Sequence, residues 1–149
     1  MEKICIAALM TFCLISSTCF NIIARAELPK PEISSSAGIL MDAKSGKVLY
    51  EKNSRQRYAP ASITKIMTAL LVAEKANMSD MVTYSESATT NLESGAVTAG
   101  VTAGDIISVN DSMYALMLKS ANEVANGLAE HVAGSISSFA AMMTARAKE

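Results

Sequence analysis

Ser62 and Lys65 are the residues whose types and spacing most directly suggest chemistry. They stand at the head of an apolar stretch, Ile63–Val72, which predicts a helix from about Ser62 to Lys75 that is buried on most sides. Side chains three positions apart share one face of a helix. A serine hydroxyl needs a base to act as a nucleophile, and a lysine amine can serve when burial or a nearby cation keeps it neutral. Unpaired N–H groups at the helix start would stabilise an oxyanion.

A second pair, Ser120 and Asn122, lies in Ser120-Ala121-Asn122 between two predicted helices. The hydroxyl could relay a proton, and the amide could bind a peptide group with a donor and an acceptor. Both pairs also have plain explanations, because Ser and Asn cap helices and a lysine in a first turn can extend to solvent. Ser108-Val109-Asn110 has the same Ser-x-Asn pattern, and we interpret it as a helix cap.

The elements before the central helix are predicted to form a β-hairpin. Two short runs, Ala37–Asp42 and Lys47–Lys52, flank the turn Ala43–Gly46. An isolated hairpin is marginally stable, so we expect it to join a larger sheet.

After the central helix the pattern alternates between short extended pieces and helices. Met81–Tyr84 and Ile106–Val109 are predicted to be extended, and Ser85–Thr102 a long surface segment with a short helix near Glu86–Ala88. Irregular segments of that length often border functional sites. Three further helices are predicted: one from about Asn110 or Asp111, one that passes through Val124, Leu128 and Val132 and stops at Gly134, and one from Ser135 to Glu149.

Composition and the N-terminus limit the class of protein. The chain has 149 residues, one domain's length, and a formal charge of −1 with no basic patch, which argues against nucleic-acid binding. Residues 1–26 are apolar and end in Ala24-Arg25-Ala26, which predicts a cleaved secretory signal peptide rather than an uncleaved anchor. All three cysteines lie in this segment, so the mature chain has no disulfide. Residues 27–36 are predicted to be an exposed leader.

Taken together, these features resemble the penicillin-recognising serine hydrolases. Ala61-Ser62-Ile63-Thr64-Lys65 heads the apolar helix, and Ser120-Ala121-Asn122 follows at a helix junction. More narrowly, residues 39–50, 60–70, 116–125 and 129–135 look like the serine-type D-alanyl-D-alanine carboxypeptidases. The resemblance covers essentially the whole mature chain. It implies an α+β fold of the β-lactamase and penicillin-binding-protein type, present here as the N-terminal hairpin plus the helical subdomain.

The resemblance also implies roles for individual residues. Ser62 would form an acyl-enzyme with the penultimate D-alanine of a peptidoglycan stem peptide, with Lys65 as its base. Ser120 would pass a proton to the departing D-alanine, and Asn122 would hold the peptide amide. β-Lactam antibiotics would be captured at Ser62, no cofactor or metal is implied, and the protein would be exported to the cell envelope.

One departure from the superfamily pattern concerns its third motif, Lys-Thr-Gly or Lys-Ser-Gly, which follows the Ser-x-Asn motif. Lys44-Ser45-Gly46 matches this motif but precedes Ser62. We interpret these residues as ones that a hairpin turn requires. The true motif would lie beyond Glu149. We therefore expect residues 37–149 to be the N-terminal part of a catalytic domain that is inactive alone, with any peripheral membrane association supplied by a later region.

Two other functions stay open. A β-lactamase would need a carboxylate-held water, and no clear equivalent of its glutamate loop is seen. A non-catalytic envelope-binding module would keep the pocket without hydrolysis. Asp42, Glu74 and Glu123 could support the site, although nothing in the sequence singles one out. His131, the only histidine, is not expected to form a catalytic triad or a metal site.

Overall fold

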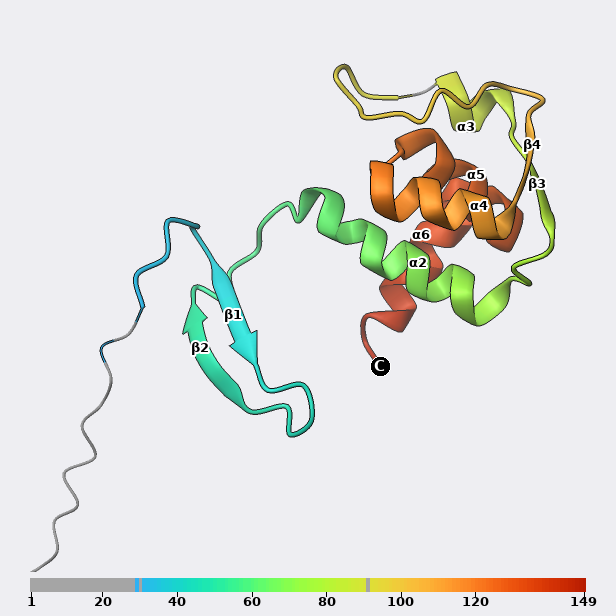
Figure 1. The fold of residues 1–149 in the computed structure, drawn as a ribbon. Helices are drawn as coiled ribbons and strands as arrows, with labels where there is room; N and C mark the ends of the chain where they lie inside the picture. Colours follow the sequence, from blue (N-terminus) through green and yellow to red (C-terminus); the bar gives the residue numbers. More distant parts are fainter. Residues whose placement is uncertain (1–28, 30, 91) are drawn as a thin grey trace, which may run out of the picture. The chain divides into compact units, whose positions relative to one another are not determined.

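The computed structural model describes residues 29, 31–90 and 92–149 (Figure 1). The predicted signal peptide, residues 1–26, lies outside the described residues. The chain divides into two compact units, one ending at Arg57 and one from Tyr58 to Glu149. Each unit is described by itself.

The first unit contains the predicted β-hairpin. Strands β1 (Gly38–Met41) and β2 (Val48–Lys52) pair antiparallel, with Leu40 opposite Tyr50. Among the described residues no third strand joins them. The larger sheet that we expected is therefore not formed within the described residues, where the other extended segments pair with each other.

The hairpin turn is held by local hydrogen bonds. Asp42 Oδ1 accepts from the Ser45 hydroxyl at 2.6 Å and from the Ser45 backbone N–H at 2.8 Å. These hydrogen bonds to Ser45 lower the pKa of the exposed Asp42 carboxyl below its usual value. Gly46 has φ +69°, a conformation that glycine adopts without a steric penalty. Turn geometry thus accounts for Ser45 and Gly46.

The segment before β1 is tied to the end of β2. The Lys52 ammonium donates to the carbonyls of Ile33 at 2.9 Å and Ser35 at 2.7 Å, and the Asn53 amide donates to the Ser36 carbonyl at 2.8 Å. These contacts give residues 33–36 a defined path along the hairpin.

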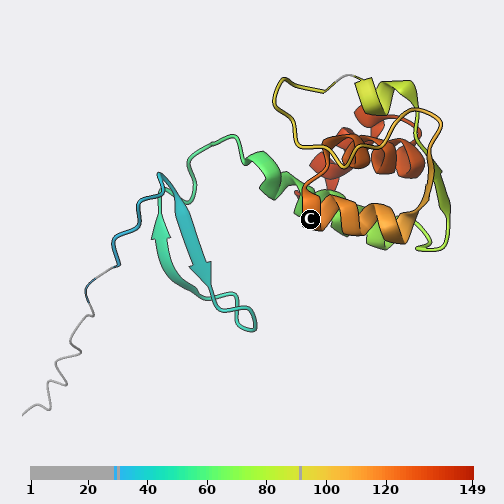
Figure 2. The same ribbon diagram turned by 45° about the horizontal axis from the view of Figure 1, so that its top comes forward.

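The second unit is mainly helical, and α5 lies at its centre. In chain order its elements are η1 (Ala61–Ile63), α2 (Thr64–Lys75), β3 (Met81–Thr83), α3 (Glu86–Thr90), β4 (Ile106–Ser108), α4 (Val109–Tyr114), η2 (Ala115–Lys119), α5 (Asn122–Ala133) and α6 (Ile136–Arg146). Helix α5 packs against α2, α3 and α6 (Figure 1, and turned by 45° in Figure 2). Strands β3 and β4 form a short antiparallel pair.

The core of the helical unit is built around α5. Its fully buried members include Leu71, Val72, Val82, Tyr84, Val109, Leu116, Val124 and Leu128. The Tyr84 ring lies against Gly127, where any Cβ would collide with ring carbons, and its hydroxyl donates to Ser112 Oγ at 2.7 Å. Burial raises the pKa of Tyr84, and the nearby Glu123 carboxylate adds to that rise.

Several predictions of the helical pattern are confirmed. Ser108 caps α4 by accepting from the Asp111 N–H at 3.0 Å, and α5 ends at Gly134, which has φ +75°. The short helix near Glu86–Ala88 is α3. Residues 92–102 are irregular and form a loop outside the helices (yellow in Figure 1).

Three details of the helical pattern were wrong. Ser62 lies in the 3-10 turn η1, and α2 begins only at Thr64. Helix α2 is not buried on most sides, because its neighbours cover only the face that carries Leu71 and Val72. On another face, Ile66 is 61% exposed. Helix α6 ends at Arg146 rather than continuing to Glu149, since the next N–H groups form tighter turn bonds, such as that from Lys148 to the Ala145 carbonyl.

Candidate functional site

The chain entering α2 positions Ser62 and Lys65. Ala61, the first residue of the 3-10 turn η1, has φ +48°, and this turn places Ser62 one turn before Lys65. The Ser62 side chain is exposed, and Lys65 is half-buried. A left-handed conformation is costly for alanine, so the surrounding structure must impose this entry into the helix.

The junction between η2 and α5 positions Ser120 and Asn122. The π-helical turn η2 ends at Ser120, which has φ +60° and ψ +34°, Ala121 is extended, and Asn122 opens α5. Among the described non-glycine residues only Asn53, Ala61 and Ser120 have positive φ. Two of these three are Ser120 itself and the neighbour of Ser62. Such strain tends to persist where surrounding contacts hold a functional site in place.

Tertiary folding brings the two predicted pairs together. Ser120 Oγ donates a hydrogen bond to Ser62 Oγ at 3.0 Å, and Lys65 Nζ donates to Asn122 Oδ1 at 2.9 Å. All four predicted site residues therefore meet in one constellation. Within the described part of the chain, no hydrogen bond joins Lys65 directly to Ser62. Contacts between catalytic groups often tighten only when substrate binds.

The backbone of the irregular segment fixes the Asn122 amide. The Val97 carbonyl accepts from the Asn122 backbone N–H at 2.9 Å and from its side-chain Nδ2 at 3.0 Å. Because only the amide nitrogen can donate to a carbonyl, the amide oxygen is left facing Lys65 Nζ. Val97 thus sets the orientation in which Asn122 holds Lys65.

Glu123 fastens this segment to the start of α5. Its side chain is 1% exposed, and Oε1 accepts from three consecutive backbone N–H groups, those of Ala99, Gly100 and Val101. Its Oε2 is buried and has no partner within the described chain. The sequence did not single out Glu123, since contacts with a segment so distant in sequence cannot be read from residue types.

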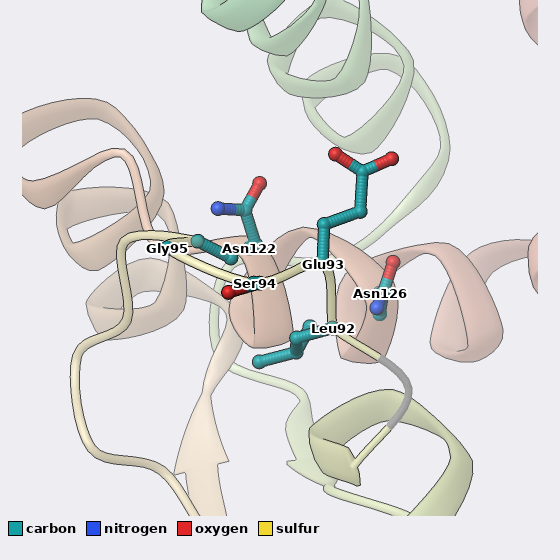
Figure 3. Close-up of a pocket in the computed structure, with 7 residues that line it drawn as sticks. Leu92, Glu93, Ser94, Gly95, Asn122 and Asn126 are labelled. Atoms are coloured by element: carbon teal, nitrogen blue, oxygen red, sulfur yellow. The ribbon is translucent and has the colours of Figure 1, made fainter.

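Two cavities adjoin the constellation. The larger, of about 440 Å³, lies among α2, α5 and α6, and the smaller, of about 300 Å³, lies between α5 and residues 92–96 (Figure 3). Both are lined by Asn122, Asn126 and Glu93, and the larger is also lined by Ser62, Lys65, Thr68 and apolar residues such as Ala129 and Phe139. This arrangement offers a hydroxyl nucleophile, an amine and amide groups to a ligand.

Sequence reasoning missed Asn126, Thr68 and Glu93 as lining residues. Asn126 stands four positions after Asn122, so helical periodicity could have placed both amides on one face of α5. Thr68 follows Lys65 by three positions and could have been found in the same way. Glu93 lies in an irregular segment, where no periodicity reports on direction.

Other candidate features lie outside the constellation. His131 Nε2 is 3.8 Å from Asp80 Oδ2 at the surface. Within the described ranges, no group of three or more His, Cys, Asp or Glu side chains is arranged to hold a metal ion. None of the helices described here combines the length and hydropathy needed to cross a bilayer.

Comparison with known proteins identifies the relatives of this chain. A family model described as D-alanyl-D-alanine carboxypeptidase, Peptidase S11, matches residues 24–149. The chain is 37% identical over 134 residues to the D-alanyl-D-alanine carboxypeptidase DacC of Escherichia coli K12, covering 85% of this chain and 34% of that protein. It is also 37% identical over 118 residues to DacF of Bacillus subtilis 168, covering 76% of this chain and 30% of that protein. The chain thus spans about a third of the length of these curated relatives.

Solved structures show the same relationship. Penicillin-binding protein 5 from Haemophilus influenzae superposes with a TM-score of 0.72 at 31% identity, over 79% of this chain and 36% of that chain. The Streptomyces K15 DD-transpeptidase carrying S96A superposes with a TM-score of 0.74 at 29% identity, over 80% of this chain and 49% of that chain. The predicted fold class, part of a penicillin-binding-protein fold, is confirmed.

Proposed function

Because this chain belongs to the D-alanyl-D-alanine carboxypeptidase family S11, we propose that it carries the nucleophile side of a serine-type D-alanyl-D-alanine carboxypeptidase site. The substrate is a peptidoglycan stem peptide that ends in D-Ala-D-Ala. One observation carries the proposal: contacts of 3.0 Å between Ser120 and Ser62 and 2.9 Å between Lys65 and Asn122 unite the two motifs.

In this reaction Ser62 Oγ attacks the carbonyl carbon of the penultimate D-alanine. The serine proton passes to the neutral form of the Lys65 amine, either directly or through the Ser120 hydroxyl. The bond to the terminal D-alanine then breaks, and Ser120 delivers a proton to the leaving amine. Water hydrolyses the ester on Ser62 and releases the shortened peptide. Asn122, held by Val97, binds the peptide amide and keeps Lys65 in place.

The same nucleophile opens the strained amide of a β-lactam, which gives a direct test. The product of the complete coding sequence is incubated with a fluorescent penicillin, and the labelled peptide is identified by mass spectrometry. We expect label on the peptide containing Ser62, and we expect Ser62→Ala to abolish it. Thr89→Ala, which replaces a hydroxyl on α3, is the control and should label normally.

Three results would contradict the proposal. Label on Ser120 instead of Ser62 would reverse the assignment of nucleophile and relay. An absence of label together with reversible binding of stem peptides would identify a non-catalytic envelope-binding module. Release of labelled penicillin within seconds, without peptide hydrolysis, would identify a β-lactamase.

The substrate also sets the location. Peptidoglycan stem peptides that end in D-Ala-D-Ala are reached on the outer side of the cytoplasmic membrane. We therefore propose export to the cell envelope, directed by the predicted signal peptide in residues 1–26. Cell fractionation with an antibody to the helical unit tests this, and a soluble cytoplasmic signal would contradict it.

A further inference from the structure

Glu93 occupies a restrained position at the entrance to the site. It opens a turn in which the Ala96 N–H donates to its carbonyl at 3.0 Å, and Gly95 has φ +81°. The residues that follow are fastened to α5 through Val97 and through the amides held by Glu123. The backbone that carries the Glu93 side chain is therefore fixed on its C-terminal side.

The Glu93 carboxylate faces the two cavities. It lines both of them and is the only acidic side chain among their lining residues. Figure 3 shows the side chain extending away from its own segment toward the green helix α2. Within the described chain, it forms no side-chain hydrogen bond and no ion pair. Lys65 lines the same cavity, but its Nζ is hydrogen-bonded to Asn122 Oδ1 rather than to Glu93.

Because Lys65 is engaged by Asn122, the Glu93 carboxylate is left to favour a cationic group on the ligand. We propose that Glu93 is a specificity-determining residue that prefers stem peptides whose side chain before the D-alanines carries a free amine over peptides in which that amine is acylated. This inference rests on the proposed function. An exposed carboxylate–ammonium pair is worth roughly 0.2–1 kcal/mol, which corresponds to a preference of at most about fivefold.

The test compares two peptides that differ only in charge. Nα-acetyl-L-lysyl-D-Ala-D-Ala with a free ε-amine and its Nε-acetyl form are assayed for released D-alanine at low ionic strength. We expect the ratio of kcat/KM, free over acetylated, to be about 1.4 to five for the wild-type product of the complete coding sequence. The ratio should fall to about one in Glu93→Gln and below one in Glu93→Lys. Added salt should shrink it, because the pair is exposed to solvent.

Glu86→Gln is the matched control. Glu86 is also exposed but lines neither cavity, so this variant removes the same charge and should keep the wild-type ratio. A ratio that is equal in wild type and Glu93→Gln overturns the inference while leaving the proposed function intact. An equal loss of kcat for both peptides, with accumulation of the acyl-enzyme, also overturns it, because Glu93 would then act on the hydrolytic water. Absence of any turnover or penicillin label overturns the proposed function itself.

Discussion

The turn of the hairpin and the candidate site of the helical unit are stabilised by hydrogen bonds that span different distances along the sequence. In the hairpin turn, Asp42 bonds to Ser45, three residues away. In the helical unit, Glu123 bonds to amides 22 to 24 residues earlier, and Ser120 bonds to Ser62 from 58 residues away. Local contacts form wherever the right residue types are adjacent, whereas distant ones require the whole unit to be folded.

This difference explains why the Lys-Ser-Gly triplet does not indicate a functional site, whereas the Ser62 and Ser120 motifs do. Lys44-Ser45-Gly46 lies in a turn that satisfies its own polar groups, so its residues are accounted for without a ligand. The Ser62 and Ser120 motifs leave a hydroxyl and an amide side by side at the edge of a cavity. A short motif therefore indicates a functional site only where the fold places other polar groups opposite it.

The contrast between local and distant hydrogen bonds is tested most strongly at Glu123. Glu123→Ala leaves three amides without their acceptor, and we expect it to lower the free energy of unfolding by about 1–3 kcal/mol. Hydrogen exchange should accelerate at Ala99–Val101 and not in the hairpin. Glu123→Gln keeps one acceptor oxygen and should lie between wild type and Glu123→Ala. Unchanged exchange in Glu123→Ala would show that the segment is held by other contacts.

The hairpin turn gives the reciprocal experiment. Gly46→Ala puts a Cβ at φ +69°, which costs roughly 1–2 kcal/mol, although nothing lies within 4 Å to collide with it. We expect NMR shifts of β1 and β2 to move toward random-coil values while those of the helical core stay constant. Ser45→Ala, which removes one hydrogen bond to Asp42, is the milder companion. Perturbation of the helical core by Gly46→Ala would contradict the expectation that the hairpin turn affects the hairpin alone.

The smallest expected effect is a pH dependence confined to the helical unit. The pKa of Tyr84 is raised in the folded state above its ordinary value of 10.0. The unfolded chain therefore loses this proton at lower pH than the folded chain, so the free energy of unfolding should fall as pH rises above about 10. Tyr84→Phe removes the titrating group and should flatten this part of the profile, measured by urea denaturation from pH 9 to 11. An identical slope in both proteins would show that Tyr84 does not contribute.

Much of the fold follows from local signals. The hairpin, the cap at Ser108, the stop at Gly134 and the short helix α3 each depend on neighbours in sequence, and each was predicted. The extent to which α2 is buried was not, because burial depends on which helices cover it. The pairing of β3 with β4 also joins segments more than twenty residues apart.

The sequence by itself determined the residue types at the site, their assignment to two helix starts and the family they resemble. Only the tertiary structure decided that Lys65 donates a hydrogen bond to Asn122, that Ser120 donates one to Ser62, and that Glu93 and Glu123 lie near the same site. The physical reason is the range of the interactions. Turns and caps are satisfied within a few residues, but the orientation of a side chain across a cavity is set by packing and hydrogen bonds between elements that the chain brings together only when folded.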